Sequence, residues 1–154
     1  MACQENQIGI KMQIYVDADA CPKVIKEVLY KAVQRVEVNM TLVADQYLRV
    51  PQSQFIKTIQ VPSDIDSADE KIVELTEPGD LVVTADIPLA DQVVSKGAFA
   101  INPRGELYTE ANIKERLAIR DMMTEMRNTG LEMGGPPAFN PKDKEQFANQ
   151  LDRF

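Results

Sequence analysis

The chain has 154 residues, of which 44% are hydrophobic and 27% are charged, a balance that suits one globular domain and argues against wholesale disorder. Its formal net charge of −7 disfavours a protein that coats nucleic acid non-specifically. The sequence has no histidine, which excludes His-based catalytic triads and zinc sites with His ligands. Carboxylate, lysine, hydroxyl and thiol chemistry remain.

The N-terminus, residues 1–11, lacks the basic and apolar regions of a signal peptide, and we predict a flexible extension there. A single domain is expected over residues 12–154. No apolar run approaches the roughly 18 residues that a membrane span requires. The two cysteines, Cys3 and Cys21, do not make a disulfide framework, so the prediction is a cytoplasmic protein that does not enter a membrane.

Short apolar runs alternate with amphipathic stretches along the rest of the chain. In chain order, the pattern predicts a strand at 12–16, a helix at 22–36, strands at 38–44 and 55–61, a helix at 67–76, a strand at 81–85, a helix at 88–96, a strand at 99–101, and helices at 109–128 and 142–154. This alternation indicates an α/β protein with a mostly parallel sheet. The Gly- and Pro-rich stretch at 130–141 is expected to wrap across the domain.

Two of the predicted strands run directly into aspartate, at Asp17 and Asp86. If these strands are neighbours, the carboxylates lie within a few ångströms of each other, and such crowding is costly without a cation. Asp19 follows Asp17 by two positions, so in an extended segment both side chains project to the same side. Ligands collect at this edge of a parallel sheet, which makes it the candidate site.

A further carboxylate is expected from the helix at 67–76. Asp69 lies in its first turn and shares the inward face with Ile72 and Val73, while Asp66 precedes the helix and could equally contribute. Asp91, in the next helix, is a candidate for an outer position. Each aspartate also has a simpler interpretation as a turn residue or a helix cap.

Oxygen ligands of this kind select hard cations, Mg²⁺ or Mn²⁺. Such an ion lowers the pKa of bound water and neutralises charge that develops on a phosphoryl group, without any need for histidine. The aspartates therefore favour a metal-dependent hydrolase of phosphodiester bonds.

Several motifs resemble those of the YaiI/YqxD family, uncharacterised bacterial proteins assigned to the PIN-like nuclease superfamily. They are DADACP at 17–22, DSAD at 66–69, GDLVVTADIPLA at 79–90, PRG at 103–105, Asn112-Ile113, Arg120-Asp121 and GGP at 134–136. The resemblance covers residues 12–154. It implies a three-layer α/β/α sandwich and a (ribo)nuclease whose Mg²⁺ or Mn²⁺ is held by Asp17, Asp86, and Asp69 or Asp66, with Asp19 beside them.

Basic residues in the C-terminal half are candidates for contact with RNA or another single-stranded nucleic acid. Arg116, Arg120 and Arg127 share a stripe of the 109–128 helix, which could also be a solvated face paired with nearby acidic residues. The family resemblance singles out Arg120 for a phosphate contact. Arg104 follows the last predicted strand and could reach the site.

Other chemistries stay open. The domain could bind RNA or a protein without cutting, or it could be an aspartyl-phosphate phosphatase that uses Asp17, Asp19 and Thr84. The usual continuation after Asp-x-Asp of such phosphatases is missing, however. Cys21 lies beside a predicted helix N-terminus, where the dipole favours thiolate, but there is no histidine to act as its base.

Overall fold

The computed structural model describes residues 12–64, 67–128 and 141–152. Six strands form one sheet in the order β4-β3-β2-β5-β6-β7. They are β2 (Ile14–Asp17), β3 (Met40–Ala44), β4 (Ile56–Gln60), β5 (Leu81–Val83), β6 (Phe99–Ile101) and β7 (Leu107–Tyr108). All neighbouring pairs are parallel except β6 and β7, which are antiparallel.

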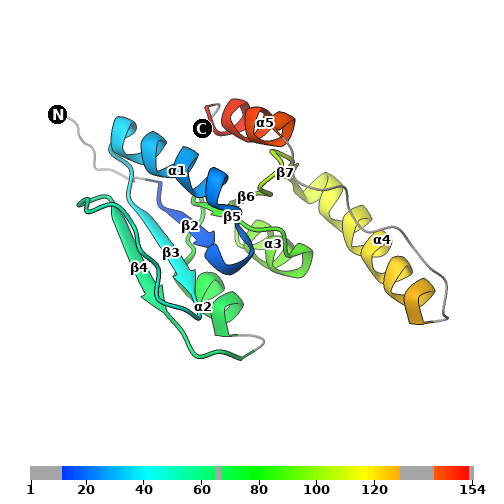
Figure 1. The fold of residues 1–154 in the computed structure, drawn as a ribbon. Coiled ribbons are helices and arrows are strands. Elements are labelled where there is room, and N and C mark those ends of the chain that lie inside the picture. The colour runs from blue at the N-terminus through cyan, green and yellow to red at the C-terminus, as the bar shows by residue number, and fades with distance from the viewer. Residues whose placement is uncertain (1–11, 65–66, 129–140, 153–154) are drawn as a thin grey trace.

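Helices lie on both faces of this sheet (Figure 1). The α-helices are α1 (Lys23–Val36), α2 (Ser67–Leu75), α3 (Ile87–Ser95), α4 (Glu110–Asn128) and α5 (Pro141–Leu151), and a 3₁₀ turn, η1 (Ala18–Ala20), follows β2. Because successive strand residues point to opposite faces of the sheet, alternate residues are buried in two separate hydrophobic cores. The first joins Val16 to α1 and to Phe147 of α5, and the second joins Tyr15 to α2, α3 and Ile113 of α4. The predicted α/β/α sandwich with a mostly parallel sheet is confirmed.

Local sequence explains why these elements form. In α1, Ile25, Leu29 and Val33 recur every four residues and are fully buried, which aligns one apolar stripe with the sheet. Every residue of β2 and β5 is buried, as expected for strands covered by helices on both faces. The helix α3 begins after Asp86, whose carboxylate accepts a hydrogen bond from the Leu89 N–H.

The structure departs from the sequence-based prediction in a few elements. The sequence did not predict the two-residue strand β7 or the turn η1. The strand expected at 81–85 ends at Val83, because Thr84 and Ala85 already lead into the turn before α3. The proposed N-terminal extension and most of the Gly- and Pro-rich stretch at 130–141 lie outside the described residues.

The helix α4 packs its N-terminal half against α3, and its C-terminal half projects from the body of the domain (Figure 1). Among the described residues, no helix combines the length and apolarity that crossing a bilayer requires.

Candidate functional site

The candidate site lies where the order of strand addition reverses. In the sheet, β3 and β4 lie on one side of the central strand β2, and β5 and β6, which come later in the chain, lie on its other side. Because β2 and β5 are parallel neighbours, with Val16 opposite Val83, their carboxyl ends meet at one edge. Such a switch point is where open α/β sheets bind ligands. The expectation that Asp17 and Asp86 follow neighbouring strands is confirmed.

Thr84 connects these two aspartates. Its hydroxyl donates a hydrogen bond of 3.0 Å to Oδ2 of Asp17 and accepts one of 3.0 Å from the backbone N–H of Asp86. Oδ1 of Asp86 caps α3 at 3.0 Å from the Leu89 nitrogen. Asp86 is therefore a helix cap, as its simpler interpretation required, and at the same time contributes negative charge at Asp17.

Asp17 is a buried carboxylate in a negative environment, with 8% of the residue exposed. Burial raises the pKa of its side chain most strongly, the hydrogen bond from Thr84 lowers it, and the negative charges of Asp86 and Asp19 raise it further. The ionised form is therefore disfavoured by desolvation and by like charge together. A cation at this edge would relieve both costs.

Asp19 lies in η1 and is exposed. Its Oδ2 accepts a hydrogen bond of 2.9 Å from the backbone N–H of Asp45, so the end of β3 holds this carboxylate in place. Asp45 follows β3 directly, which brings a further aspartate to the same edge of the sheet. Sequence analysis missed Asp45, although the signal was the one used for Asp17, an aspartate immediately after an apolar run.

The other predicted acidic residues have different surroundings. Asp69 is half-buried in the first turn of α2, which packs against β2 and β3. Asp66 lies outside the described residues. The carboxylate of Asp91 forms an ion pair of 2.9 Å with Lys114, so it connects α3 to α4.

The fit to a metal ion is partial. In the part of the chain that the structure describes, no group of three His, Cys, Asp or Glu side chains is arranged to hold one. Asp17 and Asp86 supply two carboxylates that influence each other electrostatically. A third oxygen ligand from Asp19 would require its side chain to move, because the three carboxylates do not form such a group among the described residues as they stand. The donor set consists of oxygen atoms only, which suits Mg²⁺ or Mn²⁺.

Arg104 and Arg116 form ion pairs with acidic residues other than the aspartates of the candidate site. Nη1 of Arg104 lies 3.0 Å from Oδ2 of Asp143, a buried residue in the first turn of α5. Arg116 forms an ion pair with Glu106 of the loop before β7, and not with the acidic residues of its own helix that the simpler interpretation of the stripe invoked. The side chains of Arg120 and Arg127 lie outside the description, so their phosphate contact stays a prediction.

Cys21 is next to the start of α1, as expected, but its burial disfavours the thiolate. Its side chain is buried, and burial raises the pKa of the thiol to about 12, although Lys26 lowers it. Desolvation thus exceeds the stabilisation expected from the helix N-terminus. Burial therefore disfavours a nucleophilic role for Cys21 and fits the simpler interpretation of a small buried residue before a helix.

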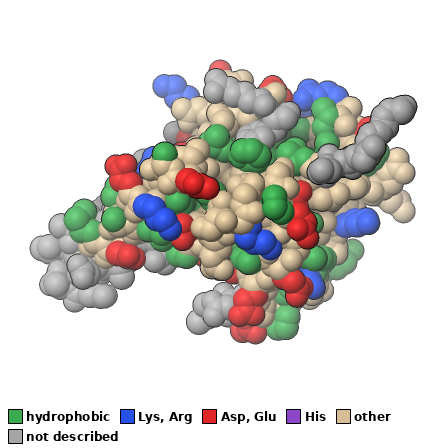
Figure 2. All heavy atoms as spheres, turned by 180° about the vertical axis from the view of Figure 1, so that it is seen from behind, with side chains coloured by type: hydrophobic (Ala, Val, Ile, Leu, Met, Phe, Trp, Pro, Cys, Tyr) green, Lys and Arg blue, Asp and Glu red, His purple; other side chains and the backbone are tan. Residues whose placement is uncertain are grey.

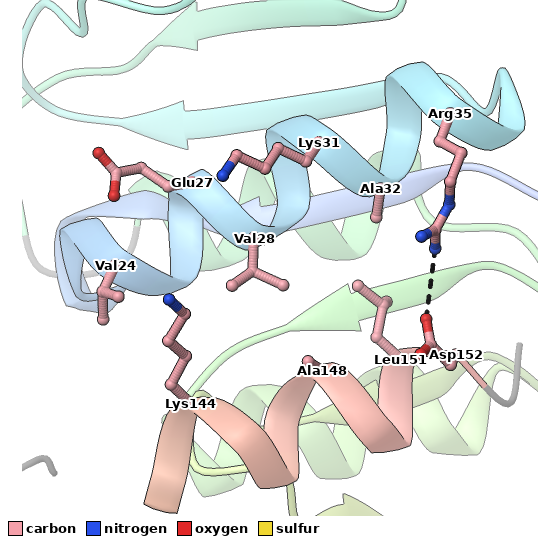
Figure 3. Close-up of a pocket in the computed structure, with 10 residues that line it drawn as sticks. All are labelled: Val24, Glu27, Val28, Lys31, Ala32, Arg35, Lys144, Ala148, Leu151 and Asp152. Carbon is pink, nitrogen blue, oxygen red and sulfur yellow. Dashed lines mark hydrogen bonds and ion pairs between the residues drawn. The ribbon is translucent and has the colours of Figure 1, made fainter. Parts of the chain in front are cut away.

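A separate cavity of about 260 Å³ lies between α1 and α5 (Figure 3). Val28, Ala148 and Leu151 provide apolar surface, and the ammonium groups of Lys31 and Lys144 lie at its rim. The ion pair between Arg35 and Asp152 bridges the two helices at one end, with 3.3 Å between Nη2 and Oδ1. None of the predicted site residues lines this cavity.

Fold and site together define an α/β/α protein with aspartates at the switch point of its sheet. A family model described as "Uncharacterized BCR, YaiI/YqxD family" matches residues 15–154. The chain belongs to this family. It is 60% identical to a UPF0178 protein of Maridesulfovibrio salexigens and 58% identical to one of Cronobacter sakazakii, in each case over 93% of this chain and 95% of the relative. No solved structure matches the chain significantly.

Proposed function

We propose that this protein is a metal-dependent hydrolase of phosphodiester bonds in single-stranded nucleic acid, with RNA as the first substrate class to test. The observation that carries the proposal is the hydrogen-bonded arrangement of Asp17, Thr84 and Asp86 at the switch point. It keeps a buried carboxylate next to two others, a cost that a bound cation would offset.

Each residue has a distinct part in the proposed site. Asp17 and Asp86 would hold Mg²⁺ or Mn²⁺, and Asp19, whose Oδ2 accepts from the Asp45 N–H, would join them through Oδ1 after its side chain moves towards the ion. The ion would lower the pKa of a water molecule and neutralise charge on the phosphoryl group. Thr84 orients the Asp17 carboxylate by donating to Oδ2, which leaves Oδ1 for the ion.

The distribution of charge suits a site entered by a short single strand better than a surface that coats nucleic acid. On the face shown in Figure 2, acidic and basic side chains are interspersed among the residues drawn in colour. A chain of net charge −7 gains little from non-specific attraction to a polyanion. Affinity would then come from the metal and from contacts close to it.

The test combines melting with cleavage. Binding of Mn²⁺ at about 100 times its Kd stabilises the native state by about 2.7 kcal/mol, roughly 5–10 °C for a chain of this length. Wild type should show this shift and should cleave fluorescent single-stranded RNA. Asp17→Asn and Asp86→Asn should lose both properties. Asn caps helices as well as Asp does, so Asp86→Asn preserves the start of α3.

Asp152→Asn is the matched control, because Asp152 is exposed and ion-paired with Arg35 between α1 and α5. It should behave as wild type does in both assays. Full cleavage by both Asp17→Asn and Asp86→Asn would refute the proposal that these aspartates form the site of a nuclease. Binding of RNA without cleavage or a Mn²⁺ shift would identify a non-catalytic binding domain. A trapped phosphate on Asp17 would identify a phosphatase.

A further inference from the structure

A polar cleft of about 580 Å³ lies between α5 and the loop that connects β6 to β7. The loop contributes Asn102, Arg104 and Glu106, and α5 contributes its amide side chains. None of the aspartates of the candidate site lines it. The cleft is therefore a distinct surface, and its chemistry can be considered separately.

The loop side of the cleft is held rigidly by one side chain. Oδ1 of Asn102 accepts hydrogen bonds from the backbone N–H groups of Arg104 and Glu106, at 2.9 and 3.0 Å. Its Nδ2 donates to Oε1 of Glu106 and to the hydroxyl of Tyr108. All of these bonds are internal, so Asn102 shapes the cleft rather than binding a ligand.

The charges around the cleft are compensated. The guanidinium of Arg104 is paired with Asp143, and the carboxylate of Glu106 is paired with Arg116. A phosphate group would find no unbalanced positive charge among these four residues. A ligand group that is polar but uncharged fits better, because it can form hydrogen bonds without displacing an ion pair.

Such hydrogen bonds are available from α5. Asn149 and Gln150 come three and four residues after Gln146, so all three lie on the helix face that lines the cleft. Within the described residues their side-chain amides form no hydrogen bond with the rest of the protein. Each amide offers both a donor and an acceptor, the combination that pairs with the edge of a nucleobase. Arg104 also lines the cleft with 35% of its side chain exposed, and a guanidinium that is paired with a carboxylate can still stack on a base.

The loop that forms one side of the cleft lies at the same edge of the sheet as the aspartates. Val83 of β5 is opposite Ile101 of β6, and the Thr84 N–H donates to the Ile101 carbonyl. The loop that starts at Asn102 is thus one strand away from Thr84, a separation of about 4.8 Å between strand axes. A flexible strand lying across this edge can reach both places.

We propose that this cleft is a nucleobase subsite, in which the amides of α5 hold an unpaired base of a single-stranded nucleic acid whose backbone continues towards Asp17. The proposal rests on the proposed function for its substrate class. In this subsite, Arg104 and α5 recognise the base of a nucleotide and not its phosphate.

The test measures binding without metal, so that cleavage plays no part. Fluorescence anisotropy in EDTA compares labelled hexaadenylate and hexauridylate with an abasic hexamer that keeps the phosphates. Wild type should bind at least one base-containing hexamer and should bind the abasic one at least tenfold more weakly. Gln146→Ala and Asn149→Ala should each weaken base-dependent binding about two- to tenfold, the loss of one uncharged hydrogen bond.

The control is Gln92→Ala, which removes an exposed amide from α3 in the opposite layer and should leave binding unchanged. Equal binding by wild type, Gln146→Ala and Asn149→Ala would overturn the subsite. So would equal affinity for abasic and base-containing hexamers, or no binding to any of them. If wild type shows base-dependent binding but no Mn²⁺-dependent cleavage, the proposed nuclease activity is refuted and the nucleobase subsite is retained.

Discussion

Replacing Gly105 by alanine tests whether α5 is seated against the loop between β6 and β7. Gly105 has φ of 90°, and a Cβ built on it would lie 2.5 Å from the backbone carbon of Gln146 and 2.6 Å from the Phe147 nitrogen. Carbon atoms in contact prefer about 3.5–4.0 Å, so loop and helix must separate by about 1 Å. Phe147 is fully buried, which makes that movement costly.

The magnitude has two parts. A left-handed backbone costs a residue with a Cβ about 1–2 kcal/mol, and overpacking against a helix backbone costs about 1–3 kcal/mol more. Gly105→Ala should therefore lower the free energy of unfolding by about 2–5 kcal/mol. For a chain of this length the melting temperature falls by about 5–15 °C.

Gly79→Ala separates these two parts. Gly79 also has φ of 90°, but a Cβ there would meet nothing within 4 Å. It should show only the backbone cost of about 1–2 kcal/mol. Denaturant unfolding followed by circular dichroism measures both variants. If Gly105→Ala is no less stable than Gly79→Ala, α5 does not pack on the loop as described, and the cleft between them loses its basis.

Three further predictions concern the core and its ionisable groups. Because the pKa of Asp17 is raised in the folded state, its contribution favours folding at low pH and is lost as the pH rises from the ordinary pKa of aspartate through the raised one. The stability of Asp17→Asn relative to wild type should thus increase from about pH 4 to neutral pH in metal-free urea unfolding, and a pH-independent difference would contradict this. In a Cys3→Ser variant, the remaining thiol of Cys21 should react with Ellman's reagent far more slowly in the native protein than in urea at pH 8, because its pKa is raised to about 12; equal rates would refute its burial. Phe147→Ala should cost about 3–5 kcal/mol in the same unfolding assay, since it leaves a cavity beneath α5, and a cost below 1 kcal/mol would show that α5 contributes little to the core.

Much of the fold could be predicted from local patterns. Apolar periodicity identified each strand of the parallel part and each α-helix to within a few residues, because a chain that crosses a covered sheet must bury both faces of its strands. The short strand β7 was missed because it has only two residues, Leu107 and Tyr108, which are too few to show the alternation of apolar and polar residues typical of a strand. Its pairing depends on Asn102 and Glu106 closing the loop before it.

The candidate site divides in a similar way. The sequence identified Asp17 and Asp86 as aspartates at strand ends, with Asp19 two positions after Asp17, and the motifs identified the family. It could not specify that Thr84 donates to Asp17, that Asp45 holds Asp19, or that Arg104 pairs with Asp143. Each of these partners is distant in sequence, and many alternatives have the same local pattern.

The sequence by itself determined the approximate positions of the α-helices and the parallel strands, and where carboxylates follow strands, because propensity and periodicity act over a few neighbouring residues. Only the tertiary structure decided that β2 and β5 are adjacent and that a buried Asp17 faces the charges of Asp86 and Asp19. It also decided that the thiol of Cys21 is too deeply buried to ionise near neutral pH. Burial and electrostatic proximity depend on all elements packed together, and no local segment encodes them alone.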